Sequence, residues 1–277
     1  METIVVDNAS ADGTAALVRA RFPRACVVES PRNVGFGAGA NLGLARARGL
    51  QILLLNPDAA LEPGALVALR QRLADDPRLA CVGPRYLRPD GGCERAGRRF
   101  PSVGAAIVDG TILERWLRRA AVMRSYYMDG AAAGAPADWL HGACLLFRQA
   151  ALQQVSGFDP GYFMYAEELD LQWRLRRRGW RCAEAPAAMV RHHGGASADQ
   201  DPEARARNFF RSRYRFAAAC WGRPFAVGLR IYVATTDLAR LAEEAVKLAV
   251  RPNRQARRRN ARQIARLAAW QWLGWRR

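Results

Sequence analysis

Two groups of acidic residues, separated by about a hundred positions, have the types and spacing that group transfer needs. Asp58 ends the triplet Asn56-Pro57-Asp58 after an apolar run, and Glu167, Glu168 and Asp170 follow much later in the chain. In metal-assisted transfer, one carboxylate holds a cation on a leaving diphosphate, and another takes a proton from the incoming nucleophile. These tasks are performed at different places, so two separate acidic sites are the minimum requirement.

The elements that must position these residues follow from the apolar runs and turn residues near the start of the chain. Strand-like and helix-like segments alternate at the spacing of βαβ units, which predicts an α/β fold with a mostly parallel sheet flanked by helices. Asp7 and Asp58 each follow such a strand, where sites in these folds form. The expected strands are Thr3 to Val6, Cys26 to Glu29 and Gln51 to Leu55, and the expected helices are Ala15 to Phe22, Gly39 to Arg48 and Pro63 to Ala74.

The second half of the chain changes character after Ser197, where the pattern becomes helical and rich in arginine. We therefore place a boundary near Asp199 to Pro202. This divides the chain into a catalytic domain at 1–200 and a basic helical extension at 201–277.

Composition limits the possible classes of protein. The chain has 277 residues and is 50% hydrophobic, which is enough for a substantial core and argues against disorder. It carries 43 Lys and Arg residues against 25 Asp and Glu residues, and the net charge of +18 favours anionic partners such as nucleotide diphosphates, phospholipid surfaces or nucleic acid.

Two further features bear on where the protein acts. The six cysteines are scattered without a C-x-x-C pair, which is typical of buried, reduced thiols and of a cytosolic protein. The most apolar late stretch, Phe225 to Val250, is interrupted by six charged residues, so we expect that it does not span a bilayer.

Four segments in register resemble the family 2 glycosyltransferases, and in particular their rhamnosyltransferase-like branch. They are Ile4 to Thr14, Asn33 to Asn41, Asn56-Pro57-Asp58 and Tyr162 to Arg174, and the resemblance covers roughly residues 1 to 220. It implies a GT-A-like, Rossmann-like fold and an inverting glycosyltransferase. Such an enzyme would move a sugar from a nucleotide diphosphate, either dTDP-rhamnose or a UDP-sugar, to a hydroxyl on a glycan or a lipid-linked acceptor.

The resemblance also implies which residues contact the sugar donor. From the residues alone, Asp7 could instead cap the next helix together with Ser10 or Asp12, and a glycine-rich turn before a helix is ordinary in many folds. The implied donor-binding residues are Asp7, Asn8, Ser10, Asp12, Asn33, Gly35, Phe36, Asn41, Asn56 and Asp58.

The triplet at 56–58 corresponds to the family's D-x-D element, with Asn56 in place of the first Asp. Asp58 is then the single carboxylate available for Mg²⁺ or Mn²⁺, which substrate phosphates would largely coordinate. His192 begins a segment that resembles the family's H-x-G-G-x-S and is expected to complete the metal site. The alternatives are an Asp in an ordinary loop turn and a surface loop with two incidental histidines.

The family usually shows Glu-Asp where this chain has Glu167 and Glu168. The resemblance makes Glu168 the general base, with Glu167 as the reserve candidate, and a Glu is competent in this role although it is one methylene longer. We expect the acceptor to contact Trp139, His141, Gly142 and Asp170. Alternatively, Trp139 belongs to the core, and Asp170 pairs with Arg174 on a solvated surface.

Two features favour other interpretations. Relatives begin with an additional strand, and Met1 here opens on what resembles their second strand, so we expect the first strand to be missing. The arginine-rich tail supports a rival hypothesis, in which the chain is a basic protein that binds nucleic acid or a membrane surface and its glycosyltransferase-like domain is inactive.

We favour the enzyme, and we do not expect nucleic acid as a partner. The expected location is the cytoplasm, peripheral at the inner face of the cell membrane. A helix from Arg257 to Trp275 would place an apolar arc against an anionic membrane surface. Alternatively, this arc packs on the catalytic domain. The arc consists of Ile264, Leu267, Ala268, Trp272 and Trp275.

Overall fold

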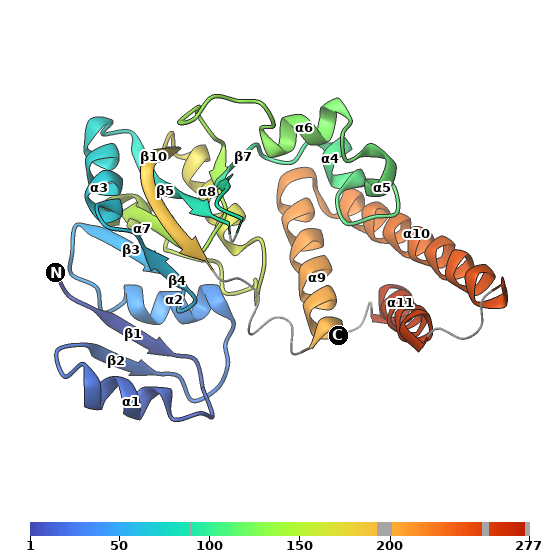
Figure 1. Cartoon of the computed structure of the whole chain (residues 1–277), viewed down its shortest axis with the longest axis horizontal. Coiled ribbons are helices and arrows are strands. Elements are labelled where there is room, and N and C mark those ends of the chain that lie inside the picture. Colours follow the sequence, from blue (N-terminus) through green and yellow to red (C-terminus); the bar gives the residue numbers. More distant parts are fainter. Residues whose placement is uncertain (89, 193–200, 251–254, 275–277) are drawn as a thin grey trace. The chain divides into compact units, whose positions relative to one another are not determined.

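The computed structural model describes residues 1–88, 90–192, 201–250 and 255–274. The chain forms two compact units (Figure 1). Unit 1 comprises residues 1–100 and 127–196, and unit 2 comprises residues 101–126 and 197–277. The second boundary lies close to the one expected from the sequence. The segment 101–126, which the expected catalytic domain includes, groups with unit 2, where Arg115 pairs with Glu243.

The main sheet of unit 1 has six strands in the order β3-β9-β5-β10-β4, with β6 beside β5. Among its described pairs, β5 and β10 run parallel, whereas β3–β9, β5–β9, β4–β10 and β5–β6 are antiparallel. The sheet is therefore mixed, and the expected mostly parallel arrangement is corrected. The strands are β3 (Gln51–Leu55), β4 (Ala59–Leu61), β5 (Leu79–Leu87), β6 (Cys93–Arg95), β9 (Cys144–Arg148) and β10 (Arg181–His192).

Two smaller sheets complete the strands of unit 1. β1 (Ile4–Asp7) pairs in parallel with β2 (Cys26–Glu29), as the alternation of strand and helix predicts. β7 (Gly97–Arg98) pairs antiparallel with β8 (Trp139–Leu140). The helices of this unit are α1 (Thr14–Arg21), α2 (Phe36–Leu44), α3 (Ala65–Asp75), α7 (Gln149–Gln154) and α8 (Glu167–Arg177).

The core of unit 1 lies between the main sheet and these helices. Buried Leu69 and Leu73 of α3, Phe147 of β9, and Leu171 and Leu175 of α8 belong to one apolar cluster. At roughly 25 cal/mol per Å² of apolar surface removed from water, this burial is the main force that holds the strand ends in place.

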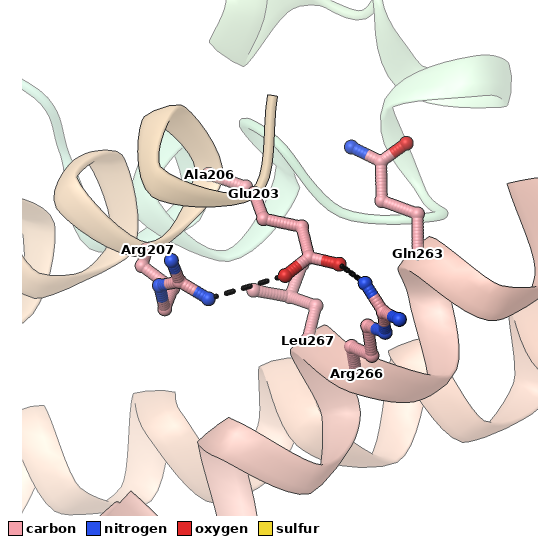
Figure 2. Close-up of a pocket in the computed structure, with 6 residues that line it drawn as sticks. All are labelled: Glu203, Ala206, Arg207, Gln263, Arg266 and Leu267. Carbon is pink, nitrogen blue, oxygen red and sulfur yellow. Dashed lines mark hydrogen bonds and ion pairs between the residues drawn. The ribbon is translucent and has the colours of Figure 1, made fainter. Parts of the chain in front are cut away.

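Unit 2 is helical. Its long helices α9 (Pro202–Trp221), α10 (Arg223–Val250) and α11 (Gln255–Leu273) pack on one another, and α4 (Val103–Val108), α5 (Glu114–Leu117) and α6 (Ala121–Tyr127) come from the earlier segment. Glu203 of α9 accepts hydrogen bonds from Arg207 at 3.3 Å and from Arg266 of α11 at 2.6 Å, beside a small hollow (Figure 2). No helix in the described part of the chain is long and apolar enough to cross a membrane.

The apolar arc expected to face a membrane from α11 faces the protein instead. Ile264 and Ala268 are buried, and Leu267 packs on the cluster formed by α9 and α10. Trp272 remains exposed, and Trp275 lies outside the described residues. The arc therefore holds α11 onto its own unit, and the expected membrane contact through this arc is not supported.

Candidate active site

The loops that follow β1 and β2 are joined by their own side chains. Asn8 Nδ2 donates to Asn33 Oδ1 at 3.0 Å and to the Gly35 carbonyl at 3.2 Å, while Asn8 Oδ1 accepts from Val34 N at 3.0 Å. Buried Asp7 accepts from Ser10 N at 2.8 Å through Oδ1. These amides and this carboxylate hold the shape of the expected donor-binding loop.

The start of α1 shows the structural role that was considered as the alternative for this segment. Asp12 Oδ1 accepts from the backbone N of Thr14 at 3.0 Å and from its hydroxyl at 2.6 Å. The Asp12 side chain therefore accepts from the backbone N–H of the first residue of the helix, and Asp12 is exposed to solvent.

Glycines bring α2 against the loop that precedes α8. Gly35 has φ +86°, and a Cβ at this position would lie 2.3 Å from the Phe163 carbonyl oxygen, which itself accepts from Phe36 N at 2.8 Å. A Cβ on Gly37 would lie 3.4 Å from Cβ of Glu167. The two sequence segments that the family resemblance singled out are therefore in contact, and Gly35 is required by this approach.

Asn41 has a different role from the one expected. Its Nδ2 donates to the Phe158 carbonyl at 2.8 Å and its Oδ1 accepts from Phe158 N at 2.9 Å. Both ends of the amide are thus used to fix the turn that leads toward α8, and we assign Asn41 to supporting this turn instead of donor binding. Phe36 packs edge-on against the ring of Phe158, with ring centroids 6.4 Å apart.

The first two residues of α8 are adjacent carboxylates. Glu167 is buried and Glu168 is half-buried, and each has an Oε2 atom that is out of contact with water and lacks a hydrogen-bond partner in the structure. Burial and then the charge of Glu168 raise the pKa of Glu167 to about 8, whereas burial raises the pKa of Glu168. The negative charge of an ionised Glu168 favours the protonated form of Glu167, so the two carboxyls titrate as a pair that carries a single charge over part of the pH range.

Asp170 does not form a solvated surface pair. It is 4% exposed, and it accepts from Arg174 Nε at 2.7 Å and from the Tyr162 hydroxyl at 3.3 Å. Arg174 also donates to the Val155 carbonyl at 2.6 Å. Since Asp170 lies in a buried network, we assign it to holding α8 in place, and the expected acceptor contact is corrected.

The end of β3 and the end of β10 bring the expected metal ligands together. His192 Nε2 lies 3.4 Å from Asp58 Oδ2. Asn56 Oδ1 is buried and lacks a hydrogen-bond partner in the structure, so it is a further oxygen available in the same triplet. Groups of three His, Cys, Asp or Glu that could hold a metal are absent from the described residues. These donors fit a cation that takes most of its ligands from a substrate.

The expected acceptor segment has one member in the core. Trp139 is 8% exposed, and its Nε1 donates to the Arg99 carbonyl at 2.9 Å. The ring is therefore buried, and the expectation that it stacks on a sugar is corrected in favour of the core alternative.

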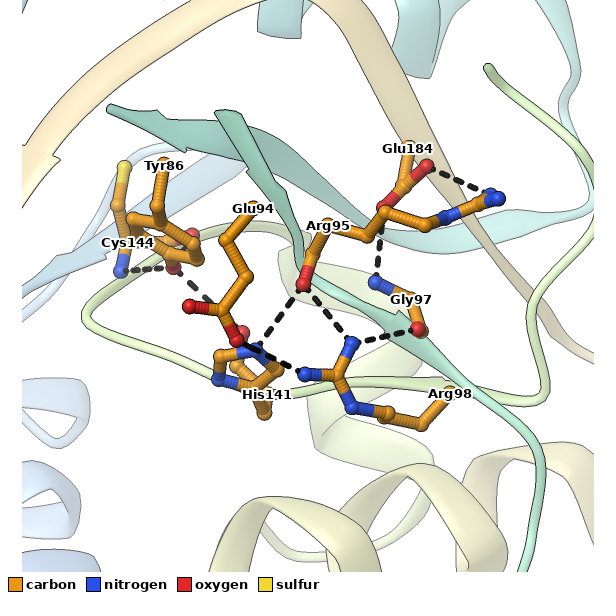
Figure 3. A network of polar contacts seen from close by, with 8 residues as sticks. All are labelled: Tyr86, Glu94, Arg95, Gly97, Arg98, His141, Cys144 and Glu184. Carbon is orange, nitrogen blue, oxygen red and sulfur yellow. Dashed lines mark hydrogen bonds and ion pairs between the residues drawn. The ribbon is translucent and has the colours of Figure 1, made fainter. Parts of the chain in front are cut away.

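His141 stays neutral near pH 7. Burial and then Arg98 lower its pKa to about 4. Its Nε2 lies 3.1 Å from the Arg95 carbonyl and 3.7 Å from Glu94 Oε1 (Figure 3). Because a carbonyl oxygen can only accept, Nε2 carries the proton and Nδ1 is left as an acceptor. Such a ring can accept a hydrogen bond from a sugar hydroxyl.

Tyr86, which sequence reasoning did not identify, connects the expected acceptor segment to the expected metal ligand His192. Its ring centroid lies 5.7 Å from that of His141 and 5.9 Å from that of His192. Its hydroxyl accepts from Cys144 N at 3.1 Å. A Cβ on Gly142, which has φ +135°, would lie 2.0 Å from this hydroxyl, so Gly142 must be glycine because the tyrosine occupies the space.

Gln172, which was also missed, joins α8 to β8. This fully buried side chain accepts from Leu140 N at 2.8 Å and donates to the Leu140 carbonyl at 2.7 Å and to the Glu168 carbonyl at 3.0 Å. The Gln172 amide thereby satisfies both backbone groups of Leu140 in β8, as the backbone of a neighbouring strand would. The residue before His141 is thus fixed to the helix turn that carries Glu168.

A third missed residue, Glu184, supports β6 and β7. Glu184 of β10 is 1% exposed, and it accepts from Gly97 N at 2.8 Å and from Arg95 Nη2 at 3.0 Å (Figure 3). The Arg95 carbonyl in turn accepts from His141. No short-range signal marks Glu184, because only the pairing of β10 with β5 brings it to Arg95.

The sequence matches known proteins of one kind. Residues 1–155 match the family described as Glycosyl transferase family 2. Over 229 residues, the chain is 30% identical to the N-acetylglucosaminyl-diphospho-decaprenol L-rhamnosyltransferase of Mycobacterium tuberculosis, and the match covers 79% of this chain and 75% of that protein.

Solved structures show the same fold. A mannosyltransferase from Pyrobaculum calidifontis, in complex with GDP-Man and Mn²⁺, aligns with a TM-score of 0.52 at 19% identity and covers 99% of this chain and 78% of its own. GalNAc-T7 with UDP, GalNAc and Mn²⁺ aligns with a TM-score of 0.50 at 14% identity, covering 69% of this chain, which spans 37% of that longer one. The GT-A-like prediction is confirmed, and the chain belongs to glycosyl transferase family 2.

Proposed function

We propose that the chain is a metal-dependent, inverting glycosyltransferase that uses a nucleotide-diphosphate sugar. The observation that carries this proposal is the carboxylate pair at the start of α8. Glu167 and Glu168 are adjacent, each has a buried oxygen without a hydrogen-bond partner among the described residues, and the pKa of each is raised. Buried carboxyl groups with raised pKa values are suited to taking a proton near neutral pH.

Glu168 is the general base in this proposal. It would remove the proton from the acceptor hydroxyl as that oxygen attacks the anomeric carbon from the face opposite the diphosphate. In this proposal Glu168 is the ionised member of the pair, and Glu167, whose pKa is raised to about 8, holds the proton. A protonated Glu167 leaves a single negative charge in the pair, which limits the cost of burying it. Neutral His141, held close to Glu168 through Gln172, would orient the acceptor hydroxyl.

The ends of β3 and β10 supply the second acidic site. Asp58 and His192 would hold Mg²⁺ or Mn²⁺, with Asn56 Oδ1 as a further oxygen. Bound there, the cation would stabilise the negative charge of the diphosphate. The loops of Asn8 and Asn33 would contact the donor, together with Asp7 and the backbone at Gly35.

The relatives suggest the donor and acceptor. The rhamnosyltransferase from Mycobacterium tuberculosis is named for transfer to N-acetylglucosaminyl-diphospho-decaprenol, and this supports dTDP-rhamnose as donor and a lipid-linked glycan as acceptor. The alternative donor is a UDP-sugar. A lipid-linked acceptor would place the reaction at the inner face of the cell membrane.

The test is a transfer assay with dTDP-rhamnose and a set of UDP-sugars, with and without EDTA. We expect metal-dependent release of the nucleotide and a product whose anomeric configuration, measured by NMR, is opposite to that of the donor. Release that EDTA does not affect would contradict the metal site. A product that retains the donor configuration would contradict the mechanism.

A further inference from the structure

The exposed face of α10 is apolar along the whole helix. Val227 is 38% exposed, Ile231 42%, Leu238 46% and Val246 65%. After Arg223, every exposed residue of α10 is uncharged, and Thr235 is the one that carries a polar side chain. The complete set is Pro224, Val227, Gly228, Ile231, Thr235, Leu238, Ala239, Ala242, Ala245, Val246, Ala249 and Val250.

This arrangement is the reverse of the usual one for a surface helix. At 100° per residue, the exposed set falls within an arc of about 140°, and the charged residues fall on the other side. With a rise of 1.5 Å per residue, the uncharged face is about 40 Å long. A surface helix normally turns its charges toward water. The charged residues are Arg230, Asp237, Arg240, Glu243, Glu244 and Lys247, all half-buried or buried.

The charges of α10 are used inside unit 2. Arg230 Nε donates to the Gln271 carbonyl of α11 at 2.9 Å. Glu243 accepts from both Nη atoms of Arg115 of α5, at 2.9 and 2.8 Å, and also pairs with Lys247. These contacts fix the rotation of the helix about its axis, because turning the charges outward would break them. The apolar face is therefore held outward.

The charge of unit 2 indicates which kind of partner covers this apolar face. Unit 2 contains 22 Arg and Lys residues against 8 Asp and Glu residues, which gives +14 of the net +18 of the chain. Two exposed tryptophans, Trp116 and Trp272, each follow a residue bonded to α10, namely Arg115 and Gln271. Apolar surface, basic residues and tryptophan together are typical of protein that lies in a membrane interface.

We propose that unit 2 binds the surface of an anionic phospholipid bilayer through the exposed face of α10. The helix lies in the plane of the membrane, with Ile231, Leu238 and Val246 at the boundary between headgroups and acyl chains. A nucleic acid would satisfy the positive charge but would leave the apolar face in water. A second copy would cover the apolar face but would bring two strongly positive units together.

Vesicle flotation with the full chain tests this proposal and requires no nucleotide sugar, so its failure leaves the proposed function untouched. We expect binding to vesicles of phosphatidylglycerol and phosphatidylcholine, with weaker binding to phosphatidylcholine alone. The variant Leu238→Glu/Val246→Glu should bind at least about tenfold more weakly. The matched control is Leu17→Glu/Val67→Glu, which changes the same residue types, at 54% and 66% exposure, in unit 1. It should bind like the unchanged protein.

Several results would overturn the proposal. Equal losses in the two variants would assign binding to net charge alone, and equal binding of all three proteins would remove α10 from the interface. Sedimentation without vesicles provides the other check, because a dimer that the α10 variant dissociates would identify a second copy as the occupant. Circular dichroism confirms folding of each variant. If the glutamates unfold the helix, Leu238→Gln/Val246→Thr makes the same comparison.

Discussion

Replacing each carboxylate of the pair by its amide separates the base from its neighbour. Glu168→Gln keeps the size of the side chain, so we expect the fold and donor binding to persist. Turnover should fall by roughly 10² to 10⁴, which is the usual contribution of a positioned general base. Glu167→Gln should lower turnover less, because in our proposal Glu167 is already protonated near pH 7.

The pair also predicts how stability depends on pH. The pKa of Glu167 is about 8 in the folded protein against an ordinary value of 4.5, and this difference corresponds to at most about 5 kcal/mol. Because the folded protein holds this proton more tightly than the unfolded chain does, the stabilisation is complete below pH 4.5 and is lost as the pH rises to about 8. The free energy of unfolding should therefore decrease across this window.

Urea denaturation at pH values from 5 to 9 measures this dependence. Glu167→Gln should flatten the curve, since the group that titrates has been removed. Glu168→Gln should reduce the decrease, since its charge is the second cause of the raised pKa of Glu167. A Glu167→Gln curve that matches the unchanged protein would refute the reasoning about burial. A larger loss of turnover in Glu167→Gln than in Glu168→Gln would show that Glu167 is the base.

Three further substitutions have definite expected outcomes. Asp58→Ala should abolish metal-dependent donor binding, and unchanged affinity for UDP and Mn²⁺ in isothermal titration would contradict the metal site. Gln172→Leu should cost about 2 to 4 kcal/mol in urea denaturation, because it leaves both backbone groups of Leu140 buried without partners. Gly142→Ala should lower the melting temperature by several degrees, because its Cβ would meet the Tyr86 hydroxyl, and an unchanged melting temperature would show that the loop can shift.

Local elements were predictable from the sequence where an apolar run meets a turn. The strands at 4–7, 26–29 and 51–55 lie where they were expected, within a residue or two. The start of α2 was less predictable. It begins at Phe36, before the expected Gly39, because Gly35 takes a positive φ and Phe163, more than a hundred residues away, closes the turn. That contact cannot be read from local sequence.

Strand direction was missed for a similar reason. Alternation of strands and helices near the start predicted a parallel sheet, but β9 comes from much later in the chain and pairs antiparallel with both β3 and β5. Parallel and antiparallel partners present similar buried apolar strands, so β9 carries no mark of its direction.

The candidate site was predictable in type and less so in detail. The family resemblance predicted that Asp58 and His192 lie close together, and the structure places them in contact. The carboxylate-rich helix also begins at Glu167, as expected. It did not distinguish side chains that face a substrate from those that support the backbone. Asn41 and Asp170 have the right chemistry for a ligand, but Asn41 bonds the backbone of distant Phe158, and buried Asp170 bonds Arg174 of its own helix and nearby Tyr162.

The same difficulty explains why α10 was passed over. Six charges within Phe225 to Val250 argue correctly against a membrane-spanning helix, and no described helix qualifies as one. The charges all lie on one side, however, and a helical pattern reveals two faces without saying which one is inside. The contact with Arg115 shows which face is inside. Arg115 lies more than a hundred residues before Glu243 in the sequence, and its two hydrogen bonds hold the Glu243 side of α10 against the rest of unit 2. The number of charged residues argues against a helix that crosses a bilayer. Only the side of α10 on which these charges lie shows that its apolar face is exposed and can contact the bilayer surface.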